Sequence, residues 1–139
     1  MVEKSNLEKA EIKAPEKGGF KKVLVVDDIT YVVKSISRIL TGAGYFVISA
    51  MTGKDALEKF RRYKPDLLTV DQKLPDMTGD HLVELIRETE AGRKTPVIFI
   101  SAVHNRSEIK PIINLGVSCY ILKPFKKEKL LENVRRLIG

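Results

Sequence analysis

The stretch Val23-Leu24-Val25-Val26-Asp27-Asp28 consists of four apolar residues followed by two carboxylates. Three later apolar runs also end in a polar residue: Leu67-Leu68-Thr69-Val70 before Asp71, Val97-Ile98-Phe99-Ile100 before Ser101, and Tyr120-Ile121-Leu122 before Lys123-Pro124. Runs of this length and composition predict buried strands, which are typical of parallel sheets. Because parallel strands end along one edge of a sheet, the sequence predicts that these acidic, hydroxyl and ammonium groups meet in one crevice.

Helical periodicity separates the predicted strands, which cover residues 22–26, 45–50, 66–70, 97–100 and 117–122. Apolar positions three or four residues apart mark five amphipathic helices: Ile29, Val32, Val33, Ile36, Ile39 and Leu40; Ala56, Leu57 and Phe60 after the cap Thr52; Leu82, Leu85 and Ile86; Ile109, Ile112, Ile113 and Leu115; and Leu130, Leu131, Val134, Leu137 and Ile138. This strict alternation predicts an α/β fold, a doubly wound five-stranded parallel sheet flanked by five helices. Its active site is expected beyond the carboxyl ends of the strands.

The composition of the chain excludes several other classes of protein. The 139 residues are enough for one domain with a real core, and no apolar run approaches the length of about eighteen residues that would span a membrane. The charged start Met1-Val2-Glu3-Lys4 is unlike a secretory signal, so a cytoplasmic location is expected. Cys119 is the only cysteine and is expected to be a small buried hydrophobe, while His81 and His104 provide no zinc set.

The net charge of the chain and the distribution of its basic residues do not identify an interaction partner. The net charge is +7, but basic residues are mixed with acids and no nucleic-acid motif accompanies them, so no nucleic-acid partner is predicted for this chain alone. Basic residues of the last helix could face solvent or an acidic partner. Residues 1–20 are predicted to be a flexible N-terminal extension of the domain 21–139, although Ser5-Asn6-Leu7-Glu8 has the form of a capping box.

The polar strand ends have the chemistry needed for phosphoryl transfer. Asp27, Asp28 and Asp71 repel one another when they are all ionised, and Mg²⁺ bound through oxygens would relieve this repulsion. Asp71 is the candidate nucleophile, because a carboxylate can form an aspartyl phosphate. Lys123 provides a mobile positive charge, and Ser101 a hydrogen-bond donor, for the phosphoryl oxygens.

Four motifs together resemble the receiver domain of bacterial two-component response regulators, over Lys22 to Ile138. They are Val23-Leu24-Val25-Val26-Asp27-Asp28, Asp71-Gln72-Lys73-Leu74-Pro75-Asp76-Met77-Thr78-Gly79, Ile100-Ser101-Ala102 and Tyr120-Ile121-Leu122-Lys123-Pro124-Phe125. The resemblance is to the single-domain form found in chemotaxis regulators. It implies a flavodoxin-like fold with strand order 2-1-3-4-5.

The resemblance also implies roles for individual residues. A histidine kinase or histidine phosphotransfer protein would donate a phosphoryl group to Asp71. Mg²⁺ would be held by Asp28, Asp71 and the backbone carbonyl of Lys73, with Asp27 acting through water.

The same resemblance implies a switch and an output surface. Ser101 and Tyr120 would move together on phosphorylation, and the Lys123-Pro124 peptide would be cis. The surface from the fourth helix through the fifth strand to the last helix would then bind a downstream protein target. The chain would act as a monomer or a phosphorylation-linked dimer, and as a phosphoacceptor rather than an enzyme.

Other interpretations stay open at the level of sequence. Tyr120 could simply pack in the core. The two positions that flank the phosphoryl group in the family are here Lys73, a basic residue that is not the family's commonest choice, and the apolar Val103, so the lifetime of the phosphate is not predicted. The chain could be the receiver part of a longer DNA-binding regulator. An aspartyl-phosphate phosphatase is a remote alternative, because Ile29 breaks the Asp-x-Asp pattern that such an enzyme uses.

Overall fold

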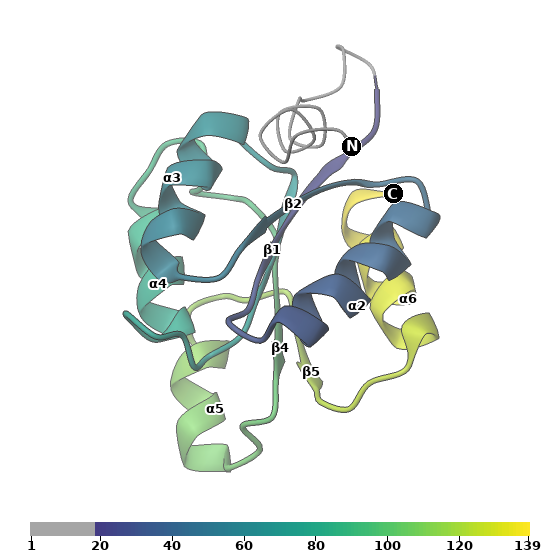
Figure 1. Ribbon diagram of the computed structural model, residues 1–139. Coiled ribbons are helices and arrows are strands. Elements are labelled where there is room, and N and C mark those ends of the chain that lie inside the picture. Colours follow the sequence, from purple (N-terminus) through teal and green to yellow (C-terminus); the bar gives the residue numbers. More distant parts are fainter. Residues whose placement is uncertain (1–18) are drawn as a thin grey trace.

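The computed structural model describes residues 19–139, in which five strands alternate with five helices (Figure 1). The elements are β1 (Lys22–Val26), α2 (Thr30–Gly42), β2 (Phe46–Ala50), α3 (Gly53–Tyr63), β3 (Leu67–Val70), α4 (Gly79–Arg87), β4 (Val97–Ser101), α5 (Arg106–Ile113), β5 (Cys119–Leu122) and α6 (Lys127–Ile138). All strands are parallel, in the order β2-β1-β3-β4-β5. The predicted fold class and strand order are therefore confirmed. The capping-box sequence at residues 5–8 lies outside the described residues.

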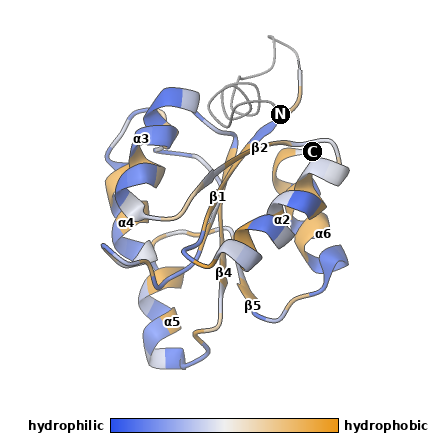
Figure 2. Ribbon diagram, viewed as in Figure 1, coloured by the Kyte–Doolittle hydropathy of each residue, from blue (hydrophilic) through white to orange (hydrophobic). Residues whose placement is uncertain are grey.

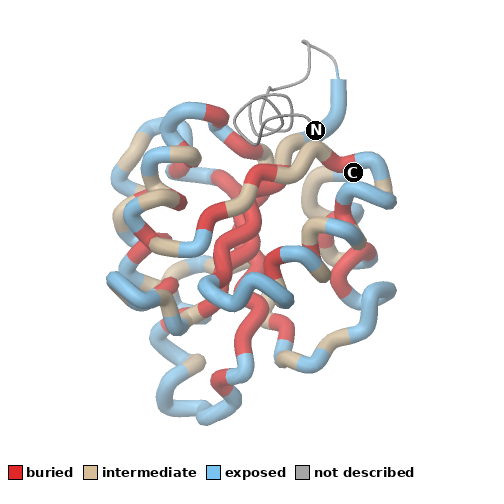
Figure 3. The backbone as a smooth tube through the Cα atoms, viewed as in Figure 1, coloured by how far each residue is buried: buried red, intermediate tan, exposed pale blue. Residues whose placement is uncertain are grey.

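Both faces of the sheet are covered by helices, which explains why its strands are apolar throughout. Alternate side chains of a strand point to opposite faces. Val23 and Val25 belong to the core beneath α2 and α6, whereas Leu24 and Val26 belong to the core beneath α3, α4 and α5. The strands are hydrophobic and buried, and they run through the centre of the molecule (Figures 2 and 3). The surrounding helices have hydrophilic residues on their outer sides (Figure 2).

Some predicted boundaries and burials are wrong. The strand predicted at 117–122 begins only at Cys119, which is half-buried rather than fully buried, and Tyr45 precedes β2. Helix α5 is short and turns a single buried side chain, Ile112, toward the sheet. Ile113 lies one residue further around this helix and is 53% exposed. A side chain about 100° away from the buried position faces solvent, so the predicted apolar stripe is narrower than expected.

The loop between β3 and α4 is a tight hairpin. Lys73 and Thr78 form an isolated antiparallel bridge, and the amide of Gly79 donates to the carbonyl oxygen of Gln72 at 2.8 Å. A Cβ at position 79 would overlap the carbonyl oxygen of Asp71, so only glycine fits this close approach of the backbone. This geometry holds the start of α4 against the residue that follows β3.

The tip of the same loop is attached to the start of α3. The two carboxylate oxygens of Asp76 accept hydrogen bonds from the amides of Gly53 and Lys54, at 2.8 and 2.9 Å. These bonds to free amides at a helix start lower the pKa of Asp76 below its usual value. Thr52 caps the same helix by accepting from the amide of Asp55 at 3.0 Å, as the sequence predicts.

None of the helices within residues 19–139 combines the length and the apolar character needed to cross a membrane.

Candidate functional site

The register of the sheet brings the predicted polar residues to one edge. Val26 of β1 pairs with Val70 of β3, so Asp27 and Asp71 follow paired residues. Ser101 is the last residue of β4 rather than the first residue beyond it. Its carbonyl oxygen accepts a hydrogen bond from the amide of Lys123 at 2.9 Å, which continues the pairing of β4 with β5.

The three carboxylates converge as the sequence predicts. Oxygens of Asp27, Asp28 and Asp71 all lie within 4.8 Å of one another; Asp27 and Asp71 are buried, and Asp28 is exposed. The ammonium Nζ of Lys123 bridges the two buried carboxylates, at 2.8 Å from Asp27 Oδ2 and 3.0 Å from Asp71 Oδ2. When all three carboxylates are ionised, one ammonium leaves two negative charges of this group uncompensated.

Burial and pairing act on these groups in opposite directions. Burial raises the pKa of Asp27, and the bonds from Lys123 and from the amide of Ile29 only partly offset it, so its pKa lies above the usual value. Burial alone would lower the pKa of Lys123, but its bonds to Asp27 and Asp71 outweigh this effect and raise its pKa. Asp27 therefore resists ionisation, while Lys123 stays protonated.

The residues fit a small divalent cation. A cleft of about 490 Å³ is lined by Asp28, Asp71, Lys73, Ser101 and Lys123, among other residues. Carboxylate and carbonyl oxygens are the ligands that Mg²⁺ prefers, and the two uncompensated charges equal the charge of one such ion. Asp28 is the exposed member of the acidic group and is one of the residues that line the cleft.

A short chain of hydrogen bonds connects Ser101 with Tyr120. The amide of Val103 donates to Ser101 Oγ at 3.2 Å, and the hydroxyl of Tyr120 donates to the carbonyl oxygen of Val103 at 2.6 Å. The ring of Tyr120 stacks on that of Phe99, with centroids 6.0 Å apart. The structure thus places Tyr120 both in the packing and in contact with the segment that follows Ser101. The Lys123-Pro124 peptide is cis, as predicted.

Two contacts beside the crevice were missed at the level of sequence, namely that of Asp76 with α3 and that of Gln72 with Asp80. The only sequence signal for the second is that Gln72, the single glutamine of the chain, directly follows Asp71. His104 and Asn105 also line the cleft and could have been noticed from their position after Ser101.

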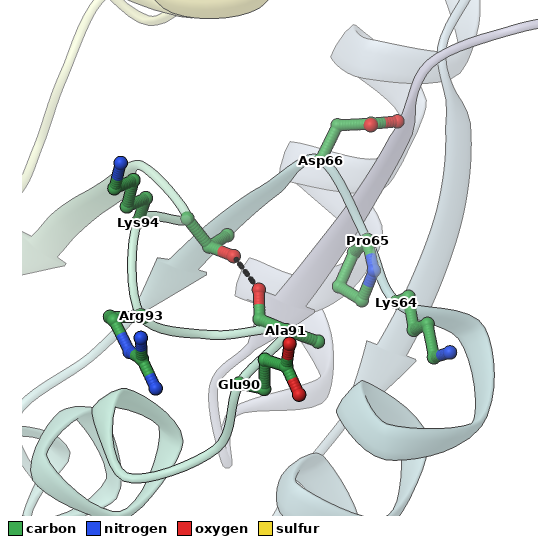
Figure 4. A pocket seen from close by; sticks show the side chains of 8 residues that line it. Lys64, Pro65, Asp66, Glu90, Ala91, Arg93 and Lys94 are labelled. Carbon is green, nitrogen blue, oxygen red and sulfur yellow. Dashed lines mark hydrogen bonds between the residues drawn. The ribbon is translucent and has the colours of Figure 1, made fainter.

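A second hollow lies at the opposite edge of the sheet, near the starts of β3 and β4 (Figure 4). Lys64, Asp66, Glu90, Arg93 and Lys94 supply charges of both signs there. In Figure 4 the basic side chains point in different directions rather than toward one centre. This hollow therefore lacks the convergence of chemical groups that the carboxyl edge has.

Three converging carboxylates with a lysine and a serine beside them at one sheet edge are the kind of arrangement that a phosphoacceptor module of a signalling system requires. Comparison with known families agrees, since the model described as the response regulator receiver domain matches residues 23–135. The chain belongs to this family, and it is accordingly a receiver domain of the kind used in phosphoacceptor signalling. The family match does not favour the phosphatase alternative.

Individual relatives support the same assignment. The chain is 38% identical over 120 residues to the chemotaxis protein CheY of Treponema pallidum, covering 84% of this chain and 82% of that protein. It superposes on the chemotaxis response regulator CheY4 of Vibrio cholerae with a TM-score of 0.80 and 29% identity, covering 86% and 99% of the two chains. It also matches the receiver domain of a Pseudomonas aeruginosa sensor histidine kinase, solved with a magnesium ion in its active site cleft (TM-score 0.81, 28% identity, 87% and 99% covered).

The raised pKa of Asp27 predicts that Asp27→Asn is more stable than the native chain at pH 7 without divalent ions. The folded state binds the proton of Asp27 more tightly than the unfolded state, so stability is lost as the pH rises through the raised pKa. The stability gain of the variant should therefore shrink as the pH falls toward 3.8 and below. Urea unfolding of both chains, in the presence of chelator and at several pH values, measures this difference in the free energy of unfolding.

The exposed Glu132→Gln on α6 is the control for this comparison and should show no such pH-dependent gain. An Asp27→Asn variant that is less stable than the native chain at pH 7 and equal to it in acid would contradict the account.

Proposed function

We propose that this receiver accepts a phosphoryl group on Asp71 from the phosphohistidine of a histidine kinase or a histidine phosphotransfer protein. The observation that carries the proposal is the position of Asp71, whose carboxylate contacts Lys123 and lies within 4.8 Å of oxygens from Asp27 and Asp28. Asp71 is 7% exposed, and it lines the open cleft through which a donor would approach. Transfer forms an O–P bond to Asp71 as the P–N bond of the donor breaks.

Backbone and side-chain contacts orient the nucleophile. Asp71 Oδ1 accepts a hydrogen bond from the amide of Gln72 at 2.7 Å, and Oδ2 accepts from Lys123 at 3.0 Å. These two bonds fix the plane of the carboxylate relative to the cleft. Once a phosphoryl group is present, the flexible side chain of Lys123 contacts one of its oxygens, and Ser101 Oγ donates to another.

Asp28, Asp71 and the carbonyl oxygen of Lys73 would hold a Mg²⁺ ion, with Asp27 acting through water. The ion would neutralise charge on the carboxylates and on the incoming phosphoryl oxygens. The acidic group and the charge imbalance of the crevice support this part of the proposal. Receiver domains of this family typically bind Mg²⁺ at such an acidic site.

The downstream signal would leave through the surface of α5, β5 and α6. This surface has exposed apolar side chains, Ile113 at 53% and Leu122 at 48%, and a small hollow around Tyr120 and Phe125. Movement of Ser101 toward a phosphoryl group would pull on Val103, which holds the hydroxyl of Tyr120. Tyr120 then biases this surface between two states, and a downstream protein binds one of them.

The remaining parts of the proposal concern how the protein works as a whole. It would assist its own phosphorylation and dephosphorylation without acting on another substrate, in the cytoplasm, as a monomer or a phosphorylation-linked dimer. The similarity to CheY over most of both chains favours output by protein–protein contact. Service as the receiver of a longer DNA-binding regulator remains the alternative.

Acetyl phosphate with Mg²⁺ should add one labile phosphate to the native chain, measured by intact mass. Asp71→Asn should not be labelled, because the nucleophile is gone, and chelator should slow labelling of the native chain strongly. The partly exposed α3 variant Asp55→Asn is the control and should be labelled as the native chain is. Equal labelling of Asp71→Asn would show that Asp71 is not the acceptor.

Phosphorylation should shift the amide NMR signals of α5, β5 and α6 in the native chain. In Ser101→Ala the label should still form, but these shifts should shrink to less than about half, because the hydroxyl that contacts Val103 is missing. Full-size shifts in phosphorylated Ser101→Ala would rule out the proposed route through Ser101 and Tyr120.

A further inference from the structure

Gln72 makes a two-point contact with the first turn of α4. Its Oε1 accepts a hydrogen bond from the amide of Asp80 at 3.0 Å, and its Nε2 donates to Asp80 Oδ1 at 3.1 Å. Only one orientation of the side-chain amide satisfies both partners, since a backbone amide needs an acceptor and a carboxylate needs a donor. The side chain is therefore fixed at its far end.

The backbone of Gln72 is fixed as well. Its amide donates to Asp71 Oδ1 at 2.7 Å, and its carbonyl oxygen accepts from the amide of Gly79 at 2.8 Å. Four hydrogen bonds thus connect one residue to the proposed phosphoacceptor on one side and to the start of α4 on the other. The neighbouring residue Lys73 is held in turn by its bridge to Thr78.

We propose that Gln72 is a positioning residue that holds the backbone of residues 71–73 and so sets the affinity of the crevice for Mg²⁺. It does so through its two hydrogen bonds with Asp80, which we call the Gln72–Asp80 clamp. The inference rests on the proposed metal site, in which Lys73 contributes its carbonyl oxygen. The side chain of Gln72 contacts Asp80 on α4, so Gln72 would act through Asp71 and Lys73 beside it rather than as a ligand. Groups that orient metal ligands in this way commonly change metal affinity by about tenfold or more.

Asp80, the partner of Gln72, is a strong hydrogen-bond acceptor. Burial opposes ionisation of Asp80, but hydrogen bonds from Thr78, Gln72 and the amide of His81 outweigh it and lower the pKa of Asp80. Asp80 is therefore an ionised acceptor at neutral pH, and a bond from an amide to a carboxylate is stronger than a bond between neutral groups. Without the clamp, the loop from residue 72 to residue 79 would keep its backbone bridge but lose its side-chain anchor on α4.

The test is calorimetric titration of the unphosphorylated full chain with Mg²⁺ alone. Gln72→Met keeps the length of the side chain and removes both bonds, so its Mg²⁺ dissociation constant should rise about tenfold. Gln72→Leu also removes both bonds and leaves the charge of the crevice unchanged, so it should bind Mg²⁺ equally weakly. The double variant Gln72→Glu with Asp80→Asn restores the pair with donor and acceptor exchanged, and should return the affinity to within about twofold of native.

His81→Ala, next to Asp80 on the exposed side of α4, is the matched control and should bind Mg²⁺ as the native chain does. Native affinity in Gln72→Met would overturn the inference, even if the melting temperature in chelator fell, because Gln72 would then be structural only. If Gln72→Met does not fold, native affinity in Gln72→Leu overturns it equally. A native chain that binds no Mg²⁺ would instead refute the proposed metal site, and this inference with it.

Discussion

The bridge from Lys123 to Asp27 and Asp71 is the interaction on which the rest of the site depends. Two carboxylates are buried side by side at the end of a parallel sheet, and a lone ammonium pairs with both. Burying one charged partner is expensive unless it is paired, and two like charges need more compensation than one cation gives. The crevice therefore keeps a net negative charge, which favours binding of a divalent cation and, after it, of a phosphoryl group.

The scaffold around this bridge is rigid where the chemistry needs it. Apolar strands fix where Asp27, Asp71 and Ser101 emerge, because their register is set by burial on both faces of the sheet. The loop after β3 is held at three points, by Gln72 on Asp80, by Gly79 against Asp71, and by Asp76 on the start of α3. The segment that follows β4 is joined to Ser101 and to Tyr120 by one hydrogen bond each, both at Val103. This combination of a firmly held loop and a single-bond contact at Val103 suits the two-state switch proposed above.

Much of this arrangement could be predicted from the sequence for a physical reason. Strands buried on both faces leave uninterrupted apolar runs, and the parallel topology then forces their ends to one edge, so the meeting of Asp27, Asp71, Ser101 and Lys123 follows from pattern alone. The roles of Tyr120 and of the Lys73 carbonyl came only from family resemblance.

The rest depended on geometry that no local pattern encodes. The contact of Asp76 with α3 joins residues more than twenty positions apart through a loop, and the Gln72–Asp80 clamp depends on the exact turn made by the loop. The exposure of Ile113 depends on how α5 is rotated against the sheet, which apolar composition does not reveal.

We propose one divalent-cation site in the described part of the chain, at the carboxyl edge of the sheet, where Asp27, Asp28 and Asp71 converge. Titration with Mn²⁺, a paramagnetic substitute for Mg²⁺, followed by amide NMR tests it most directly. The account predicts that signals of residues 27, 28 and 71–73 broaden first, and that those of residues 64–66 and 90–95 at the opposite edge persist. First broadening at residues 64–66 and 90–95, or no preferred site at all, would contradict it.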